Sequence, residues 1–125
     1  MAPDARRRLG DTGEALVARW YEQAGYTVVD RNWRCREGEL DLVCVGGLGR
    51  DAQLVFCEVK TRRSTAFGSP LEAVTHAKAR RIRALARAWL AEHRGTGAPR
   101  LRFDVAAVLM LPGTAPEVDV VEGAF

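Results

Sequence analysis

A long helix-like segment between two strand-like runs is the feature that most constrains the fold of this chain. Residues 69–72 predict a helix start, with a serine N-cap, a proline at the first helical position and a glutamate closing a capping box. The helix should run to about His93. β-forming residues dominate 53–60 before it and 101–111 after it. A crossover of this length allows the two strands to be parallel neighbours.

The remaining elements complete an α/β pattern. Apolar spacing predicts a helix over residues 11–25, capped by Asp11 or Thr12. Residues 26–33 and 39–45 read as strands, and 118–121 as an edge strand. The order is helix, three strands, helix and one or two strands, which predicts a mixed sheet with helices on its faces. The 125 residues suit a single domain, with a core over about 10–111 and a short basic N-terminal tail.

Composition excludes several classes of protein. No apolar run approaches the roughly 18 residues of a membrane helix, and no apolar segment follows the first arginines as in a signal peptide. The cysteines Cys35, Cys44 and Cys57 are odd in number and form no C-x-x-C pair, so we expect reduced thiols. These features predict a cytoplasmic protein without a membrane segment.

Positive charge gathers in one part of the chain. The net charge is only +3, but residues 60–102 carry eleven cations and two carboxylates, a local charge of +9. Such segregation is typical of a face that binds a polyanion, and equally of a solvated helix face. Charge alone leaves both interpretations open.

Acidic residues are predicted to converge with a lysine at one end of a hairpin. A glycine-rich turn at 46–51 joins the strands at 39–45 and 53–60, so that paired positions add to about 98 or 99. This register puts Asp41 opposite or diagonal to Glu58. Because side chains alternate along a strand, Glu58 and Lys60 share one face. Two carboxylates and an ammonium should therefore lie together.

Phosphodiester hydrolysis uses these residue types. Carboxylate oxygens hold Mg²⁺, which polarises the phosphate and acidifies a water, and a cation orients the water or offsets charge. The alternative is a cross-strand ion pair at the end of a sheet. A second carboxylate in compatible register, a further acid at Glu14 and the cations Arg62 and Arg63 directly downstream favour the chemical interpretation.

Five short motifs resemble those of a known family. They are Gly13-Glu14, Arg31-Asn32, the stretch 38–43, the stretch 58–62 and the stretch 102–105. Together they resemble the YraN-like family of small bacterial proteins, which is assigned to the restriction-endonuclease-like superfamily with the PD-(D/E)xK motif and is similar to archaeal Holliday-junction resolvases. The resemblance covers about residues 10–110 and implies an αβββαβ core with a metal-dependent nuclease site.

The resemblance also implies roles for individual residues. Asp41 matches the first acid of the motif, Glu58 the second and Lys60 the lysine, while Glu14 matches an additional helix glutamate of the resolvase-like branch. Leu40 stands where the motif name has proline.

The implied activity is DNA cleavage that depends on Mg²⁺ or Mn²⁺, on branched or otherwise structured DNA. Asp41, Glu58 and the carbonyl of Val59 would hold the metal, Lys60 would position the attacking water, and Glu14 would assist. Junction-cutting enzymes need two sites, so by analogy we expect a homodimer. Two alternatives are a nucleic-acid-binding module on the same fold with little turnover, and an interaction protein with a structural ion cluster.

Five of the charged residues have competing interpretations. Glu14 could instead complement the dipole at the start of its helix. Lys78 interrupts the apolar stripe of the second helix, where it could extend to solvent or reach a phosphate beside the carboxylates. Arg62 and Arg63 are the preferred phosphate contacts, against an ordinary solvated loop. Asp104, which follows Arg102 closely, is predicted to be a structural ion-pair partner.

Overall fold

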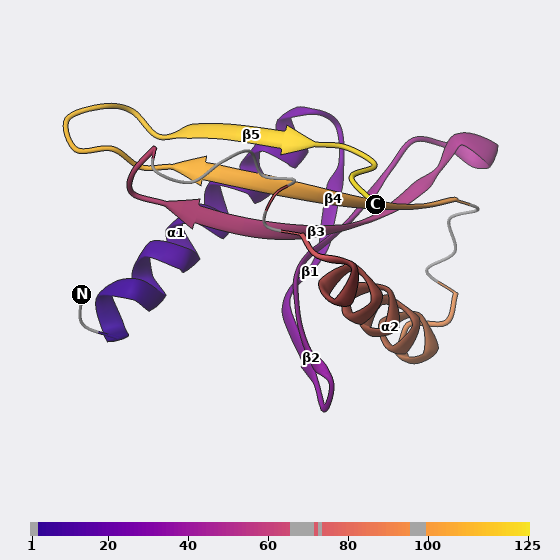
Figure 1. Ribbon diagram of the computed structural model, residues 1–125. Coiled ribbons are helices and arrows are strands. Elements are labelled where there is room, and N and C mark those ends of the chain that lie inside the picture. The colour runs from indigo at the N-terminus through magenta and orange to yellow at the C-terminus, as the bar shows by residue number, and fades with distance from the viewer. Residues whose placement is uncertain (1–2, 66–71, 73, 96–99) are drawn as a thin grey trace.

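The chain forms a mixed α/β fold with a five-stranded sheet and two helices (Figure 1). The computed structural model describes residues 3–65, 72, 74–95 and 100–125. The main elements in chain order are α1 (Pro3–Gln23), β1 (Thr27–Cys35), β2 (Gly38–Gly46), β3 (Gln53–Arg62), α2 (His76–Glu92), β4 (Arg100–Leu109) and β5 (Glu117–Val121). The predicted order of elements is confirmed. Within the described ranges, neither helix is long and apolar enough to cross a membrane.

The strands follow one another across the sheet in chain order. Neighbouring strands are antiparallel except for β3 and β4, which are parallel and run side by side from Gln53↔Arg100 to Arg62↔Leu109. The chain between them contains α2, as the predicted crossover requires. The parallel pairing of these two strands is therefore confirmed.

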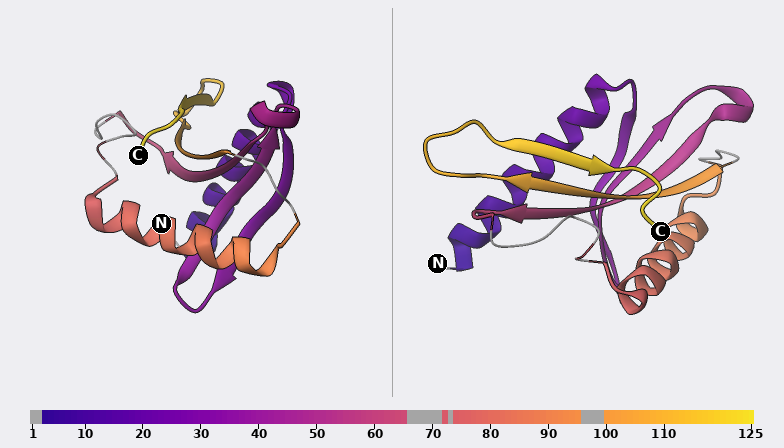
Figure 2. Two further views of the ribbon diagram at one scale, coloured as in Figure 1. Left: turned by 90° about the vertical axis from the view of Figure 1, so that its right-hand side faces the viewer. Right: turned by 45° about the horizontal axis from the view of Figure 1, so that its top comes forward.

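The helices cover opposite faces of the sheet and bury two separate apolar clusters (Figure 2). On the α1 side, Val17 and Tyr21 pack among buried residues of β2, β3 and β4. On the α2 side, Ile82, Leu85 and Trp89 are buried, which confirms these three positions of the predicted apolar stripe. The stripe was also predicted to include Val74, which precedes α2, and Leu71, which lies outside the described residues. Burying one such large side chain stabilises the fold by about 1.5–3 kcal/mol.

Both helices start at positions that differ from the predictions. α1 begins at Pro3, so Asp11 and Thr12 both lie inside the helix and the predicted cap at either residue is wrong. Proline is favoured at the first helical position, where a missing N–H costs no hydrogen bond. α2 begins at His76, because Thr75 is extended (φ −88°, ψ 165°) and its side chain accepts a hydrogen bond from the amide of Lys78. The predicted cap at 69–71 lies outside the described residues.

A buried ion pair ties the α1 side of the sheet together. Asp104 is fully buried and accepts two hydrogen bonds of 2.8 Å from Arg102, one of 2.6 Å from the hydroxyl of Tyr21 and one of 3.0 Å from the amide of Gly123. These four bonds satisfy a charge that would otherwise be costly to bury. The prediction that Asp104 is a structural ion-pair partner is confirmed.

Candidate metal and phosphate site

The hairpin of β2 and β3 has the predicted register. Leu42 lies opposite Cys57 and Val43 opposite Phe56, so paired positions add to 99. One step beyond the last pair, the same register places Asp41 opposite Glu58. The ladder between β2 and β3 ends at Leu42, although β3 continues to Arg62. The two strands therefore diverge at Asp41 and form a fork.

At the fork, the side chains of β2 change the face of the sheet on which they lie. Leu42 packs in the cluster under α1, whereas Leu40 packs in the cluster under α2. Residues two apart on a regular strand lie on the same face, so β2 rotates at Asp41. In β1 the residue at this level is Asn32, whose φ of 50° lies in the left-handed region. Asparagine tolerates this conformation better than other residues with a side chain.

Asp41 binds the backbone that the fork exposes. Its Oδ2 atom accepts a hydrogen bond of 2.8 Å from the amide of Val59, in the part of β3 that no longer pairs with β2. A half-buried amide without such an acceptor would be costly. The carboxylate of Asp41 therefore takes the place of a backbone acceptor for the amide of Val59. This bond fixes the side chain where β2 and β3 diverge.

Three carboxylates converge at the fork. Oxygen atoms of Glu14, Glu39 and Asp41 all lie within 4.8 Å of one another, and each of these residues is half-buried. Glu14 comes from α1, and Gly13 allows that helix to approach β3 because a Cβ at this position would overlap Oγ1 of Thr61. Gly13 thus permits the close contact between α1 and β3, and Glu14 next to it supplies an acidic side chain.

The electrostatics of Asp41 reflect this crowding. Burial and, after it, the nearby charges of Glu58, Glu14 and Glu39 together raise the pKa of Asp41 to about 7, although the hydrogen bond from Val59 opposes the shift. Carboxylates that share a site disfavour the ionised form of each other. A cation at the fork would relieve this repulsion.

Two lysines bind the same oxygen of Glu58. The Nζ atom of Lys60 lies 3.2 Å and that of Lys78 lies 3.0 Å from Oε1 of Glu58. The side chain of Lys78 is 18% exposed, so it reaches from α2 to the carboxylate and does not extend to solvent. Burial lowers the pKa of Lys78, and the neighbouring Lys60 lowers it further.

The structure brings most of the predicted site residues together. Contacts or charge interactions connect Asp41 with Glu14, Glu58 and Val59 and connect Glu58 with Lys60 and Lys78. Position 14 lies well inside α1, so a capping role at the helix start does not explain its glutamate.

The two predicted phosphate-binding arginines follow the site residues of β3 along the chain. Arg62 is the last residue of β3 and, two positions after Lys60, shares its face. Arg63 follows the strand and is exposed. Arg63 also lines a cavity together with residues between β4 and β5.

Sequence reasoning missed two residues that shape the site. Glu39 was not assigned to it, although its spacing of two from Asp41 within a strand predicts a shared face. The other is Asn32, which the sequence indicates only as part of the Arg31-Asn32 motif. Asparagine is disfavoured inside strands, so its place between Arg31 and Trp33 was a signal for irregular backbone.

The fold and the site define a mixed α/β protein with a centre of acids and lysines at a fork in its sheet. The chain matches the family model of the uncharacterised protein family UPF0102 over residues 13–108, and it belongs to this family. The expected membership in a YraN-like family is thereby confirmed at the level of UPF0102.

Named relatives cover nearly the full chain. A UPF0102 protein of Frankia alni is 52% identical over 126 residues, with 100% of both chains covered. A UPF0102 protein of Nocardia farcinica is 51% identical over 121 residues, which are 96% of this chain and 91% of the relative. One of Acidothermus cellulolyticus is 48% identical over 130 residues, covering 97% and 96% of the two chains.

Proposed function

We propose that this protein is a metal-dependent endonuclease with a restriction-endonuclease-like core, which hydrolyses phosphodiesters of branched or otherwise structured DNA in the cytoplasm. The observation that carries the proposal is the fork at Asp41, where three carboxylates meet and a fourth, Glu58, is held by two lysines. Phosphodiester hydrolysis needs acidic side chains that hold a metal ion next to cations that act on the phosphate.

The donor atoms fit Mg²⁺ or Mn²⁺. Both ions prefer oxygen ligands, and the oxygens of Glu14, Glu39 and Asp41 lie within 4.8 Å of one another. The ligands we assign are Asp41, Glu58 and the carbonyl of Val59, with Glu14 and Glu39 beside them. When bound, the metal would polarise the phosphate and make a water a stronger nucleophile.

The chain's own cations would act on the water and the phosphate. The Nζ atom of Lys60 would donate a hydrogen bond that orients the attacking water, and Lys78 would offset charge on the phosphate. Arg62 and Arg63 would bind the DNA backbone beyond the end of β3. Cleavage of both strands of a junction would require two copies of the chain.

Cleavage of a labelled four-way junction and its component duplex, with and without Mn²⁺, tests the proposal. Wild type is compared with Glu58→Ala and with Glu117→Ala, a control at an exposed position on β5. We expect Mn²⁺-dependent cutting that is lost only in Glu58→Ala. Absence of cutting in all proteins, or equal cutting by Glu58→Ala, would contradict the proposal.

The same samples test the alternative of a binding module. That alternative predicts junction binding without cleavage in wild type and in Glu58→Ala. Its affinity should fall with salt, and removing one phosphate-binding arginine should reduce the slope of log affinity against log salt by about one.

A further inference from the structure

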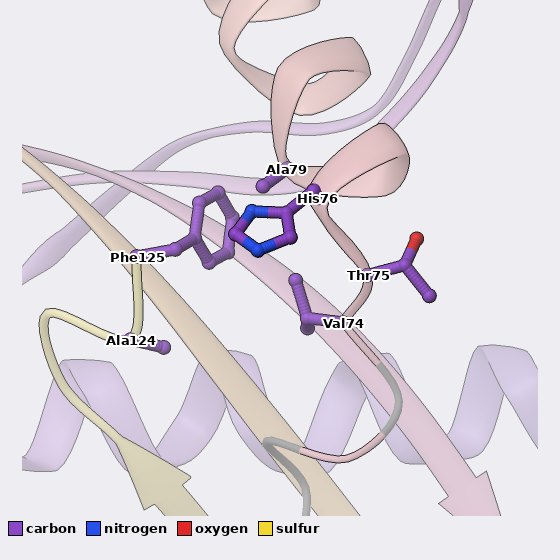
Figure 3. Close-up of a pocket in the computed structure, with 6 residues that line it drawn as sticks. All are labelled: Val74, Thr75, His76, Ala79, Ala124 and Phe125. Carbon is purple, nitrogen blue, oxygen red and sulfur yellow. The ribbon is translucent and has the colours of Figure 1, made fainter.

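Two cavities lie along one side of α2, away from the acidic site. The first has a volume of about 470 Å³ and lies between the start of α2 and the C-terminal segment, lined in part by His76, Ala79 and Phe125 (Figure 3). The second has a volume of about 260 Å³ and lies between α2 and the start of β4. Its lining consists of Arg83, Ala86, Arg87, Leu90, Leu101 and Phe103.

A stack of three side chains separates the two cavities. The ring of Phe125, which lines the first cavity, stacks on the ring of Phe103, which lines the second, with centroids 5.4 Å apart. The guanidinium of Arg83 lies 4.7 Å from the centroid of Phe103 and 5.8 Å from that of Phe125. The cavities are thus neighbours, and we call them together the α2 groove.

The α2 groove follows a single face of the helix. The α2 residues that line it are spaced by three, four or seven positions, which places them on one side: His76, Ala79, Arg83, Ala86, Arg87 and Leu90. Lys78 lies on another side and contacts Glu58. The α2 groove is therefore separate from the candidate metal and phosphate site.

Apolar surface and uncompensated positive charge meet in the second cavity. Leu101 is 48% exposed, which is unusual for a large apolar side chain in this protein. Arg83 and Arg87 are also exposed, and within the described part of the chain neither forms an ion pair. A guanidinium stacked on an aromatic ring keeps its edge donors available for a carboxylate.

We propose that the α2 groove binds an acidic amphipathic helix of a partner protein. Apolar side chains of the partner would fill the two cavities, and its carboxylates would pair with Arg83 and Arg87. Ala79 and Ala86 are two helical turns apart, about 10 Å, which matches apolar residues spaced by seven positions in a bound helix. A DNA backbone would use the arginines but would leave the apolar lining without a partner, so the lining favours a peptide.

Fluorescence anisotropy with a labelled acidic amphipathic peptide tests this proposal independently of nuclease activity. The peptide carries leucines seven positions apart, and two matched peptides replace its glutamates by lysines or its leucines by serines. We expect binding of the first peptide with a Kd of about 0.1 mM or tighter, and binding at least about tenfold weaker for the other two.

Protein variants locate the binding surface. Arg87→Glu and Leu101→Ser should each weaken binding about tenfold, about 1.4 kcal/mol. Arg81→Glu changes the same charge on the opposite side of α2 and should leave the affinity unchanged. Thermal melts check that every variant is folded. No binding of the acidic peptide, equal effects of Arg87→Glu and Arg81→Glu, or binding of a duplex oligonucleotide that depends on Arg87 but not on Leu101 would overturn the proposal.

Discussion

The backbone amide of Val59 donates a hydrogen bond of 2.8 Å to the carboxylate of Asp41. This bond joins β3 to β2 immediately beyond the last ladder pair of the two strands. It therefore fixes an acidic side chain at the place where the sheet opens. The position of Asp41 depends on the local backbone of β1 and β2, and this dependence can be tested by mutation.

The left-handed backbone conformation at Asn32 should make the free energy of unfolding sensitive to the residue at this position. Replacing Asn32 by Ala forces a residue with no local hydrogen bond into φ 50°, so we expect a loss of about 1 kcal/mol in the free energy of unfolding. Asn32→Gly removes the Cβ penalty and should remain close to wild type. Urea denaturation of both variants measures the difference, and equal stability of the two would contradict this role of the backbone.

The raised pKa of Asp41 predicts that the free energy of unfolding of the metal-free protein depends on pH. Burial and neighbouring carboxylates raise this pKa from 3.8 to about 7. Between these values the unfolded chain has released the proton while the folded chain keeps it, so folding becomes less favourable as pH rises. Above pH 7 this loss of unfolding free energy is complete. Asp41→Asn removes it and should stabilise the metal-free protein by roughly 2–4 kcal/mol at about pH 8.

The same pair of proteins supplies the control. At about pH 4 the side chain is neutral in the folded protein and only about half ionised in the unfolded chain, so the stability difference between wild type and Asp41→Asn should fall below about 1 kcal/mol. Adding Mn²⁺ at high pH should stabilise wild type but not the variant. A difference in unfolding free energy that stays constant with pH would show that the carboxylate is not held in its neutral form.

Lys78 should matter more for DNA cleavage than for folding. In Lys78→Gln the carboxylate of Glu58 keeps its contact with Lys60, so the melting temperature should change little. If Lys78 offsets charge on the phosphate, cleavage should fall about 10²-fold. Lys78→Arg keeps the charge but not the geometry and should restore part of the rate. A variant Lys78→Gln with full activity would show that Lys78 only neutralises Glu58.

Asp104 should behave as a structural acid. Asp104→Asn leaves Arg102 without its buried counter-charge, so we expect a loss of about 3–5 kcal/mol in unfolding free energy. At a temperature where the variant is folded, its affinity for Mn²⁺ should equal that of wild type. Loss of Mn²⁺ binding by folded Asp104→Asn would instead place this carboxylate in the metal site.

Much of the fold could be predicted because local patterns agree with the tertiary structure. The glycine-rich turn fixed the register of β2 and β3, and the crossover length indicated that β3 and β4 are parallel. The start of each helix could not be predicted. A capping box at 69–72 has the right residue types, but Thr75 closer to the apolar stripe provides the actual cap of α2.

The candidate site was only partly predictable for a similar reason. Strand alternation and register place Asp41 near Glu58, and both depend on regular backbone. Glu39 reaches the same cluster from β2 and Glu14 from α1, and the fork brings both to Asp41. A rotation of β2 at the level of one left-handed residue in β1 cannot be read from periodicity.

Binding of Mn²⁺ to the metal-free protein is the most direct test of the central claim that the fork at Asp41 is a metal site. Calorimetric titration near pH 8 should show a bound ion in wild type and in Glu117→Gln. Asp41→Asn should lose binding, because a neutral amide replaces an assigned carboxylate ligand. Glu39→Gln should bind more weakly, because it removes a negative charge beside the metal site. No binding by wild type, or equal binding by all four proteins, would contradict the account.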